Sequence, residues 1–325
     1  MILTIIGLLF LYFFHEIGHF GAAKVVGVKV AELSIGLGDK KLFSKEINGT
    51  VYSLKLICLG GYVKLDNSFR DLRPRTRIFV GMAGPAASLL FSFLLFTFIS
   101  FVGLPELTTH IGTVSPGYPA VKAGLHPGDR VVAIEGHPVS KWNEMISLIN
   151  GGKDKNLRVT IQRAQTEFDV FVHPQLKKGS AVLGINASGE SVATRYGLGS
   201  AMEGARLVAE TLKVNFGILR HMVVVKKVEG VAGPVQILQI GAQQAGFGII
   251  LFLNLLSLLN LSFVCVNFFP VLPFDGGIIA IAFMEAVSGR QINRRIEYIV
   301  NKVVVSILVG LLVFNVLSEL AKKMI

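Results

Sequence analysis

Residues 1–23 read MILTIIGLLFLYFFHEIGHFGAA, an otherwise apolar run that contains His15, Glu16 and His19. A helix of about 20 apolar residues is long enough to cross a lipid bilayer, so this stretch predicts a membrane span that carries three ionisable side chains. A cleaved signal peptide is the alternative, but no positive charge precedes the run and the ionisable residues follow its apolar part. We therefore expect this helix to be retained.

The composition of the whole chain also indicates a membrane protein. Of its 325 residues, 52% are hydrophobic and 16% are charged, against roughly 25% charged in an average soluble domain. An ordinary soluble enzyme and a disordered chain are both disfavoured. The net charge of +11 is assigned to loops near anionic lipid headgroups. Nucleic acid is not an expected partner, because the sequence has no basic stripe with interleaved aromatic residues.

Three further stretches are apolar and long enough to span a bilayer, at 78–103, 246–273 and 298–318. The predicted fold class is a polytopic α-helical membrane protein with about four spans, a β-hairpin loop and one inserted β-rich domain. We expect an N-terminal membrane region at 1–106 and the inserted domain at 107–178. A connecting region outside the cytoplasm follows at 179–245, and a C-terminal membrane region at 246–325.

Basic residues in the short loops predict the orientation of the chain. The loop 24–77 holds 11 Lys and Arg against five acidic residues, and three arginines lie between the third and fourth spans. The positive-inside rule places both loops in the cytoplasm, and therefore the N-terminus and the segment 104–245 on the other side. Lys322 and Lys323 disagree mildly, because this topology puts them outside as well.

Segment 107–178 has the pattern of a small independent domain. We expect strands at 111–114, 131–134, 157–161 and 168–172, helices at 120–124 and 142–149, and a tight turn at Glu135-Gly136. The order Ala120-x-x-Ala123-Gly124-Leu125-x-x-Gly128-Asp129 resembles a PDZ domain. PDZ domains bind an extended peptide as an added strand, so a peptide ligand is expected. The alternative is a β-domain that serves as a plug or spacer.

The first cytoplasmic loop contains a second β signal. Residues 32–35 and 52–56 alternate between apolar and polar side chains, and Asn48-Gly49 between them is a strong hairpin turn. A hairpin this apolar beside a membrane helix is expected to dip into the bilayer, where its backbone must be paired or face a cavity. A surface hairpin is the alternative. Further along we expect a helix at 201–219, a strand at 223–228 and a helical start at 233–235.

His15-Glu16-Ile17-Gly18-His19 is an HExxH motif. In a helix, residues i and i+4 share a face, and two imidazoles placed this way can share one Zn²⁺ ion. Glu16 would then be close enough to act as general base. The same letters occur by chance in many helices. Inside an apolar helix, however, ionisable groups cost several kcal/mol unless they pair or bind a metal, which favours a metal site.

A catalytic zinc ion needs a third protein ligand. The strongest candidate is Asp275, in the stretch Asn267-Phe-Phe-Pro270-Val-Leu-Pro273-Phe-Asp275-Gly276-Gly277 at the end of the third span. The two prolines break the helix, and an unwound segment can present a carboxylate at membrane depth. The alternative is that Asp275 caps the next helix. Both motifs fall at the predicted cytoplasmic ends of their helices, which favours one shared site.

Taken together, these motifs resemble the site-two protease family of intramembrane zinc metalloproteases, of the bacterial sigma-E regulator type. Segments 60–64, 83–85 and 233–235 are also similar to that family. The resemblance implies that His15, His19 and Asp275 bind Zn²⁺, that Glu16 is the catalytic base and that Asn267 helps to hold substrate or oxyanion. Ser88 stands where many relatives have Asn.

The same resemblance implies the setting of the activity. We expect a bacterial inner-membrane hydrolase that cleaves single-span membrane proteins within the bilayer, such as anti-sigma factors or signal-peptide remnants, with its active site toward the cytoplasm. Two rival functions stay open. A non-catalytic PDZ scaffold would not need Glu16. A metal transporter would line further spans with ionisable residues, and 78–103 contains none.

Overall fold

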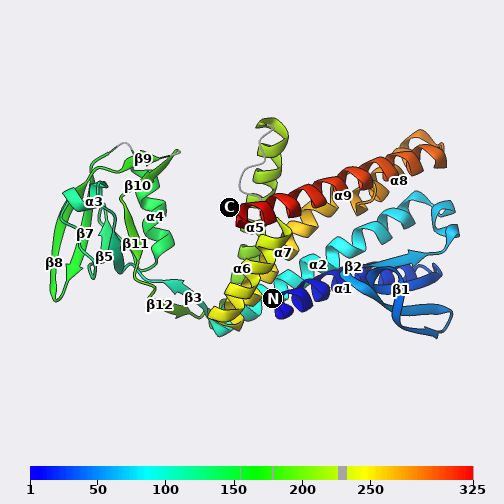
Figure 1. Cartoon of the computed structure of the whole chain (residues 1–325), viewed down its shortest axis with the longest axis horizontal. Coiled ribbons are helices and arrows are strands. Elements are labelled where there is room, and N and C mark those ends of the chain that lie inside the picture. Colours follow the sequence, from blue (N-terminus) through cyan, green and yellow to red (C-terminus); the bar gives the residue numbers. More distant parts are fainter. Residues whose placement is uncertain (154, 178, 226–232, 325) are drawn as a thin grey trace. The chain divides into compact units, whose positions relative to one another are not determined.

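The computed structural model describes residues 1–153, 155–177, 179–225 and 233–324. The chain divides into two compact units (Figure 1). The first, here called the membrane unit, contains Met1–Phe101 and Tyr196–Ile325, and the second, the inserted unit, is Val102–Arg195. One continuous segment is therefore inserted between two parts of a helical unit, as the hydropathy pattern predicted.

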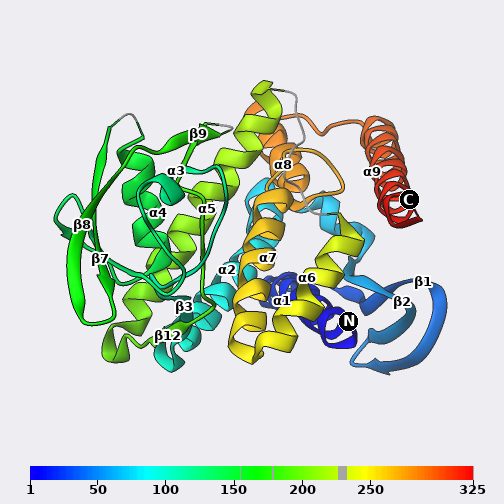
Figure 2. The same ribbon diagram turned by 60° about the vertical axis from the view of Figure 1, so that its left-hand side comes forward.

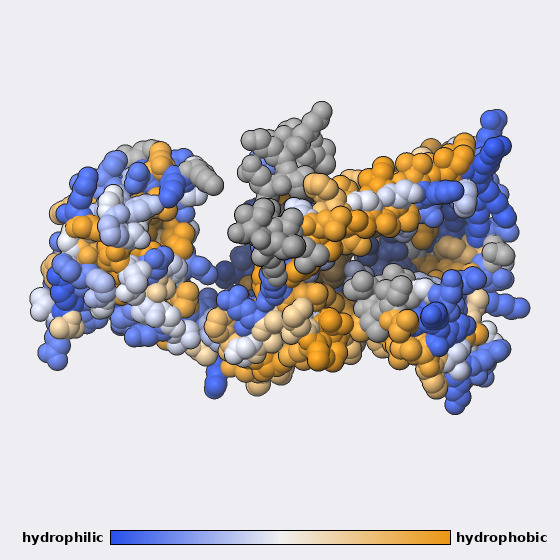
Figure 3. All heavy atoms as spheres, in the orientation of Figure 1, coloured by the Kyte–Doolittle hydropathy of each residue, from blue (hydrophilic) through white to orange (hydrophobic). Residues whose placement is uncertain are grey.

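Four helices of the membrane unit are long and apolar enough to cross a membrane. They are α1 (Ile2–Val25), α2 (Pro74–Val102), α7 (Ile249–Asn267) and α9 (Arg294–Met324, of which Arg294–Ser318 qualifies). The predicted positions of the four spans are confirmed as helices. Figure 3 shows apolar surface along α9, and the qualifying stretch of α9 buries none of its residues within the chain.

The third span is shorter than the predicted 246–273. It begins after Gly248, whose φ of 138° interrupts the preceding helix, and it ends at Asn267. Pro270 and Pro273 follow at once, and proline removes the backbone donor that a helix interior needs. Residues 268–274 form turns, after which α8 (Asp275–Ser288) begins.

Helix α1 contacts both α2 and α7. Leu11 packs in a buried cluster with Phe252 and Leu256 of α7, and Phe91 of α2 packs against the same cluster. The ring of Phe14 stacks on Phe91 with centroids 4.3 Å apart. Gly18 brings α1 close to α2, because a Cβ atom at this position would lie 2.3 Å from Ala83 O and 2.7 Å from Ala87 Cβ. Small residues allow such close helix approach within membranes.

Two ion pairs join the ends of three helices on one side of the membrane unit. Arg77, near the start of α2, pairs with Glu285, near the end of α8, and both side chains are buried. Arg70, in the short 3₁₀ helix η1 (Asn67–Asp71), pairs with Glu297 at the start of α9. A buried pair broken at one partner leaves an uncompensated charge, so these contacts fix α8 and α9 against α2.

The region predicted as a separate connecting segment, 179–245, is divided between the two units. Helix α5 (Ser200–Val225) contacts α7, and α6 (Pro234–Phe247) contacts α1 and α7. The predicted start of a helix at 233–235 is confirmed. The strand predicted at 223–228 is wrong for 223–225, which continue α5, because the β propensity of a short valine run is overridden by its context. Residues 226–228 lie outside the described residues.

The loop between α1 and α2 forms two long strands, β1 (Val30–Ile47) and β2 (Thr50–Leu65). Asn48 and Gly49 join them with φ angles of 50° and 72°, the left-handed values of a two-residue hairpin turn. Both strands bend strongly (Figure 2). Residues 32–35 consequently pair with 61–64 on one side and with 51–54 on the other.

The inserted unit is a β-rich domain with two short helices, α3 (Pro119–Lys122) and α4 (Trp142–Gly151). Its main sheet has the strand order β6-β5-β7-β8. These strands are β6 (His137–Pro138), β5 (Arg130–Ile134), β7 (Leu157–Arg163) and β8 (Thr166–Val172). The predicted helices, the turn at Glu135-Gly136 and the strands of this sheet are confirmed.

Three smaller strand pairs complete the inserted unit. β3 (Leu104–Leu107) pairs with β12 (Ser191–Thr194), and β4 (Ile111–Val114) pairs with β11 (Ile185–Ala187). β9 (Gln175–Lys177) pairs with β10 (Ser180–Val182). The 3₁₀ helix η2 (Gly197–Gly199) follows in the membrane unit. Because β11 and β12 pair with strands at the start of the unit, the unit extends beyond the predicted 107–178.

A buried carboxylate stabilises the inserted unit. The Asp129 side chain is 1% exposed and accepts hydrogen bonds from Arg163 Nε at 2.6 Å and from the His126 backbone N–H at 2.8 Å. Burial alone would raise the pKa of Asp129. The hydrogen bonds from these donors lower it by a larger amount, so the pKa lies below its ordinary value of 3.8.

The contact at Gly18 predicts opposite effects for two glycine substitutions in α1. A Cβ atom added at Gly21 would have no other atom within 4 Å. Gly21→Ala is therefore expected to leave the stability of the protein unchanged or to raise it by up to ~1 kcal/mol through helix propensity. Gly18→Ala should destabilise by about 1–3 kcal/mol because it overpacks the α1–α2 contact. Thermal unfolding in detergent checks both, and equal melting temperatures for the two variants would contradict the packing described.

The Asp129 ion pair predicts a pH-dependent loss of stability. Asp129→Asn should lower the stability of the inserted unit by about 1.5–3 kcal/mol at pH 7. A depressed carboxyl pKa stabilises the fold fully above pH 3.8 and progressively less as the pH falls below that value. The difference between wild type and variant should therefore shrink in acid.

Urea unfolding of the full chain measures this effect, because Trp142 is the single tryptophan and its fluorescence reports on the inserted unit alone. Asp169→Asn is the matched control: Asp169 is exposed and lies 3.9 Å from Arg158, so it should have little effect. A stability difference for Asp129→Asn that stays constant through pH 3 would contradict the prediction.

Candidate metal centre

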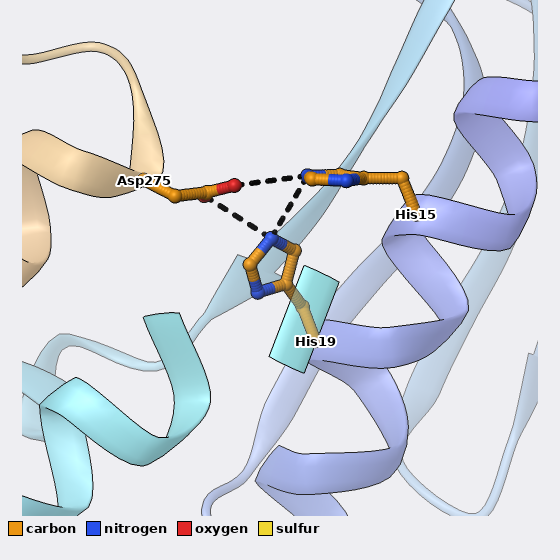
Figure 4. Close-up of side chains that lie close together, drawn as sticks. All are labelled: His15, His19 and Asp275. Carbon is orange, nitrogen blue, oxygen red and sulfur yellow. Dashed lines mark hydrogen bonds and ion pairs between the residues drawn. The ribbon is translucent and has the colours of Figure 1, made fainter. Parts of the chain in front are cut away.

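His15, His19 and Asp275 come together inside the membrane unit. Their ligand-type atoms all lie within 4.8 Å of one another. His15 Nε2 is 3.0 Å from Asp275 Oδ2, His19 Nε2 is 3.1 Å from Asp275 Oδ1, and the two Nε2 atoms are 3.2 Å apart. Figure 4 shows the three side chains pointing at one common point, with both histidines on α1 and the aspartate at the start of α8.

Local sequence explains the placement of each side chain. The two histidines are one turn apart on α1 and share a face. Asp275 is the first residue of α8, and its carboxylate oxygens contact the two histidine Nε2 atoms. The backbone turns tightly before α8, since a Cβ atom on Gly276 would lie 2.4 Å from Phe268 O. Asp275 therefore follows an unwound segment, as expected, while the N-cap of α8 is Phe274 and not Asp275.

The hydrogen bond of the His19 ring determines which of its nitrogen atoms carries the proton. His19 Nδ1 lies 2.8 Å from Val80 O, and a carbonyl oxygen only accepts, so Nδ1 carries the proton. His15 Nδ1 is 3.1 Å from the Ser88 hydroxyl oxygen. With both Nδ1 atoms protonated, both Nε2 atoms present lone pairs to each other and to a carboxylate. Such an arrangement is suited to holding a cation.

The donor set fits a zinc ion. Three donors each about 2.0–2.1 Å from a tetrahedral ion are themselves ~3.3 Å apart, close to the observed 3.0–3.2 Å. Asp275 Oδ2 is buried without a properly directed hydrogen bond. Space is also preserved beside the donors, because a Cβ atom on Gly84 would lie 2.2 Å from His19 Nε2. Two imidazoles and one carboxylate leave a fourth position open, as in catalytic sites.

The other two predicted residues also lie at this centre. Asn267 Nδ2 is 3.3 Å from His15 Nε2, so the last residue of α7 reaches the ligands. Glu16 accepts a hydrogen bond from the Val63 backbone N–H. A Cβ atom on Gly61 would lie 3.7 Å from Glu16 Cγ. The second half of β2 therefore runs directly past the carboxylate of Glu16.

The sequence analysis missed the contribution of α2 to this centre. Val80, Gly84 and Ser88 are spaced four residues apart and form one stripe of that helix. Val80 O and Gly84 meet His19, and Ser88 meets His15. The signal was present as Gly84 and Ser88 one turn apart within an otherwise bulky apolar span, but it acquires meaning only once α2 is known to face the histidines.

The chain is similar to a known protein family over most of its length. The model of peptidase family M50 matches residues 3–311. The chain belongs to peptidase family M50. As an M50 member with four helices able to span a membrane, it is a membrane metalloprotease.

Similar M50 proteins occur in distant bacteria and carry names of zinc metalloproteases. A Campylobacter jejuni protein is 29% identical over 98% of this chain and 92% of its own length. A Rickettsia conorii protein is 27% identical over 98% of both chains. A Nostoc protein is 28% identical over 94% of this chain and 91% of its own.

Two solved PDZ domains also match part of the chain. One, from an SdrC-like protein of Listeria monocytogenes, matches 26% of this chain and 90% of its own length at 20% identity. The other, from an SdrC-like protein of Listeria innocua, matches 25% of this chain and 92% of its own length at 22% identity. The TM-score is 0.23 for both. A TM-score this low carries no conclusion, so the PDZ-like nature of the inserted unit stays a prediction.

The contact between α2 and His19 predicts the effect of Gly84→Ala. The added methyl group would lie against the His19 donor nitrogen, so zinc affinity should fall ~10-fold or more. Gly81→Ala, one turn earlier on α2, is the matched control, because its nearest neighbour is the Ile279 side chain at 3.1 Å. Zinc content after dialysis against a chelator measures both variants, and full zinc retention by Gly84→Ala would show that α2 does not lie against the ligand.

Proposed function

We propose that this chain is an intramembrane zinc metalloprotease that hydrolyses peptide bonds within or near the membrane segments of single-span proteins. The observation that carries the proposal is the meeting of His15, His19 and Asp275 between apolar helices of the membrane unit, 3.0–3.2 Å apart. Ionisable groups at such a depth mark functional sites. A peptide bond cleaved there must belong to a chain that is itself within the bilayer.

His15, His19 and Asp275 are the proposed ligands. A zinc ion held by them supplies a Lewis acid that polarises a carbonyl oxygen and makes water more acidic. The chain itself provides the rigidity of the site, since each histidine is held through its Nδ1 atom by α2. Fixed ring orientation of this kind is typical of metal-binding histidines.

Glu16 is the proposed general base. It takes one proton from the attacking water while the water oxygen bonds to the carbonyl carbon, and it delivers that proton to the leaving nitrogen as the C–N bond breaks. The products are a carboxyl group and an amine, and Glu16 returns to its starting state. Asn267 is 3.3 Å from His15 Nε2, where its amide N–H can donate to the oxygen that becomes negative.

The hairpin is the proposed binding site for the unwound substrate. A helical substrate has its amides hydrogen-bonded internally, so the bond to be cleaved must first become extended. Residues 61–64 pair with 32–35 along one edge, and on the other edge Val63 already donates to Glu16. A substrate strand added beside Gly61 and Val63 would bring its backbone to the catalytic carboxylate.

The proposed location is the bacterial inner membrane, with the metal centre toward the cytoplasm and the inserted unit on the opposite side. Support comes from the ion pairs of Arg70 with Glu297 and of Arg77 with Glu285, which gather the start of α2, the end of α8 and the start of α9 on one side. The predicted cytoplasmic loops meet there. A peptide ligand of the inserted unit and anti-sigma factors or signal-peptide remnants as substrates belong to the same proposal.

Replacing the general base tests the proposal. The full chain is reconstituted in vesicles with a single-span reporter protein, and cleavage is followed by the appearance of the two fragments. Glu16→Gln should lower the cleavage rate on the order of 10²–10⁴-fold while the variant still binds zinc, because Glu16 is not among the ligands.

Glu210→Gln is the matched control, because Glu210 lies on the exposed side of α5 in an ion pair with Arg206 and makes the same change of charge. Its cleavage rate should equal that of the wild type. Unchanged cleavage by Glu16→Gln would reject the assignment of the base. A wild-type chain that binds the reporter and never cleaves it would favour the non-catalytic scaffold.

A further inference from the structure

A chain of buried polar contacts lies behind His15, on the side away from the metal centre. His15 Nδ1 meets Ser88 Oγ at 3.1 Å, Ser88 O accepts from Asn260 Nδ2 at 2.7 Å, and the same Nδ2 donates to Ser92 Oγ at 2.8 Å. The Ser92 hydroxyl in turn donates to Ser257 O at 3.4 Å. These contacts connect α1, α2 and α7, the three spans that surround the histidines.

Each atom in this series of hydrogen bonds has a defined role as donor or acceptor. Ser88 O is a carbonyl oxygen and only accepts, so the Asn260 atom that lies next to it is the amide nitrogen. When His15 Nε2 binds a metal ion, His15 Nδ1 carries the ring proton and donates to Ser88 Oγ. The amide of Asn260 therefore fixes the backbone at Ser88, and the hydroxyl of Ser88 fixes the His15 ring.

The depth of these residues argues that the contacts are specific. Ser88 is 2% exposed, Asn260 is 1% exposed and Ser92 is fully buried. A buried polar group that lacks a partner is costly, and α7 carries no charged residue. Asn260 also lies seven residues, or two helical turns, before Asn267, so both asparagines project from one side of α7.

We propose that Ser88 and Asn260 are positioning residues for the metal centre. Ser88 holds the His15 ring in the tautomer and orientation that directs Nε2 to the metal, and Asn260 holds Ser88 in place. This inference rests on the proposed function, because it assumes that His15 is a ligand. Its consequence is that the third span takes part in the site twice, through Asn267 next to the ligands and through Asn260 behind them.

Metal affinity tests this proposal without reference to cleavage. Ser88→Ala removes the hydroxyl group, and Ser88→Thr retains it. Ser100→Ala is the matched control: Ser100 is also buried in α2, but it lies 12 residues further along, about 18 Å away. Zinc affinity is measured by competition with a chelator, ligand geometry by the visible absorption of the Co²⁺-substituted protein, and fold integrity by the melting temperature of the metal-free protein.

The expected result is a zinc affinity ~10–100-fold lower for Ser88→Ala, with an altered Co²⁺ spectrum and a metal-free melting temperature matching that of Ser100→Ala. Ser88→Thr should restore both the affinity and the spectrum. Wild-type zinc affinity in Ser88→Ala would overturn the proposal, as would an equal loss in Ser100→Ala. If Ser88→Ala also destabilises the metal-free protein, Ser88→Thr decides: restored affinity supports the role, and unrestored affinity overturns it.

Asn260→Ala separates the second step from the first. It should weaken zinc binding less than Ser88→Ala does, and it should cause no further loss when combined with Ser88→Ala, because Asn260 acts through the Ser88 hydroxyl. Fully additive losses would reject this order. His19→Ala serves as the reference for the proposed function: if it binds zinc as the wild type does, the ligand set itself is wrong, whatever the result at Ser88.

Discussion

Three lone-pair-bearing atoms that point at one another inside a set of apolar helices form the central constraint of this protein. With lone pairs on both Nε2 atoms, the two imidazoles and the Asp275 carboxylate attract a cation to the point where they meet. Water cannot screen that attraction at membrane depth. Under the proposed function, a divalent ion would stabilise the contact between α1 and α8 as well as provide the chemistry. Function and packing would then depend on the same interaction.

The close approach of α2 makes this arrangement possible. Gly18 on α1 and Gly84 on α2 have no side chains, and the two helices come near enough for the Val80 carbonyl to reach His19. Each histidine is consequently held at two points, the metal-facing Nε2 and the Nδ1 bonded to α2. A bulkier α2 would separate the rings from their second partners and leave the ring orientations free.

The site is assembled from segments with different physical roles. The helices exclude water and carry the ligands, while the strongly bent β2 brings backbone N–H groups past Glu16. Backbone of this kind is tolerated within a membrane only where it is paired or lines a cavity, and residues 32–35 are paired along both sides. The hairpin is therefore suited to present one remaining edge to an extended chain.

The sequence alone determined the four spans, the helical spacing of the HExxH pair and the Asn48-Gly49 turn, because length, helical spacing and left-handed turn residues are local properties. It did not determine the course of α5, where the run of valines after 222 suggested a strand, nor the extent of the inserted unit, which depends on β11 and β12 returning to pair with its first strands. Only the tertiary structure decided that Ser88 meets His15 across 73 residues and Asn260 across 172. Contacts between such distant residues follow from how helices pack, and no local spacing records them.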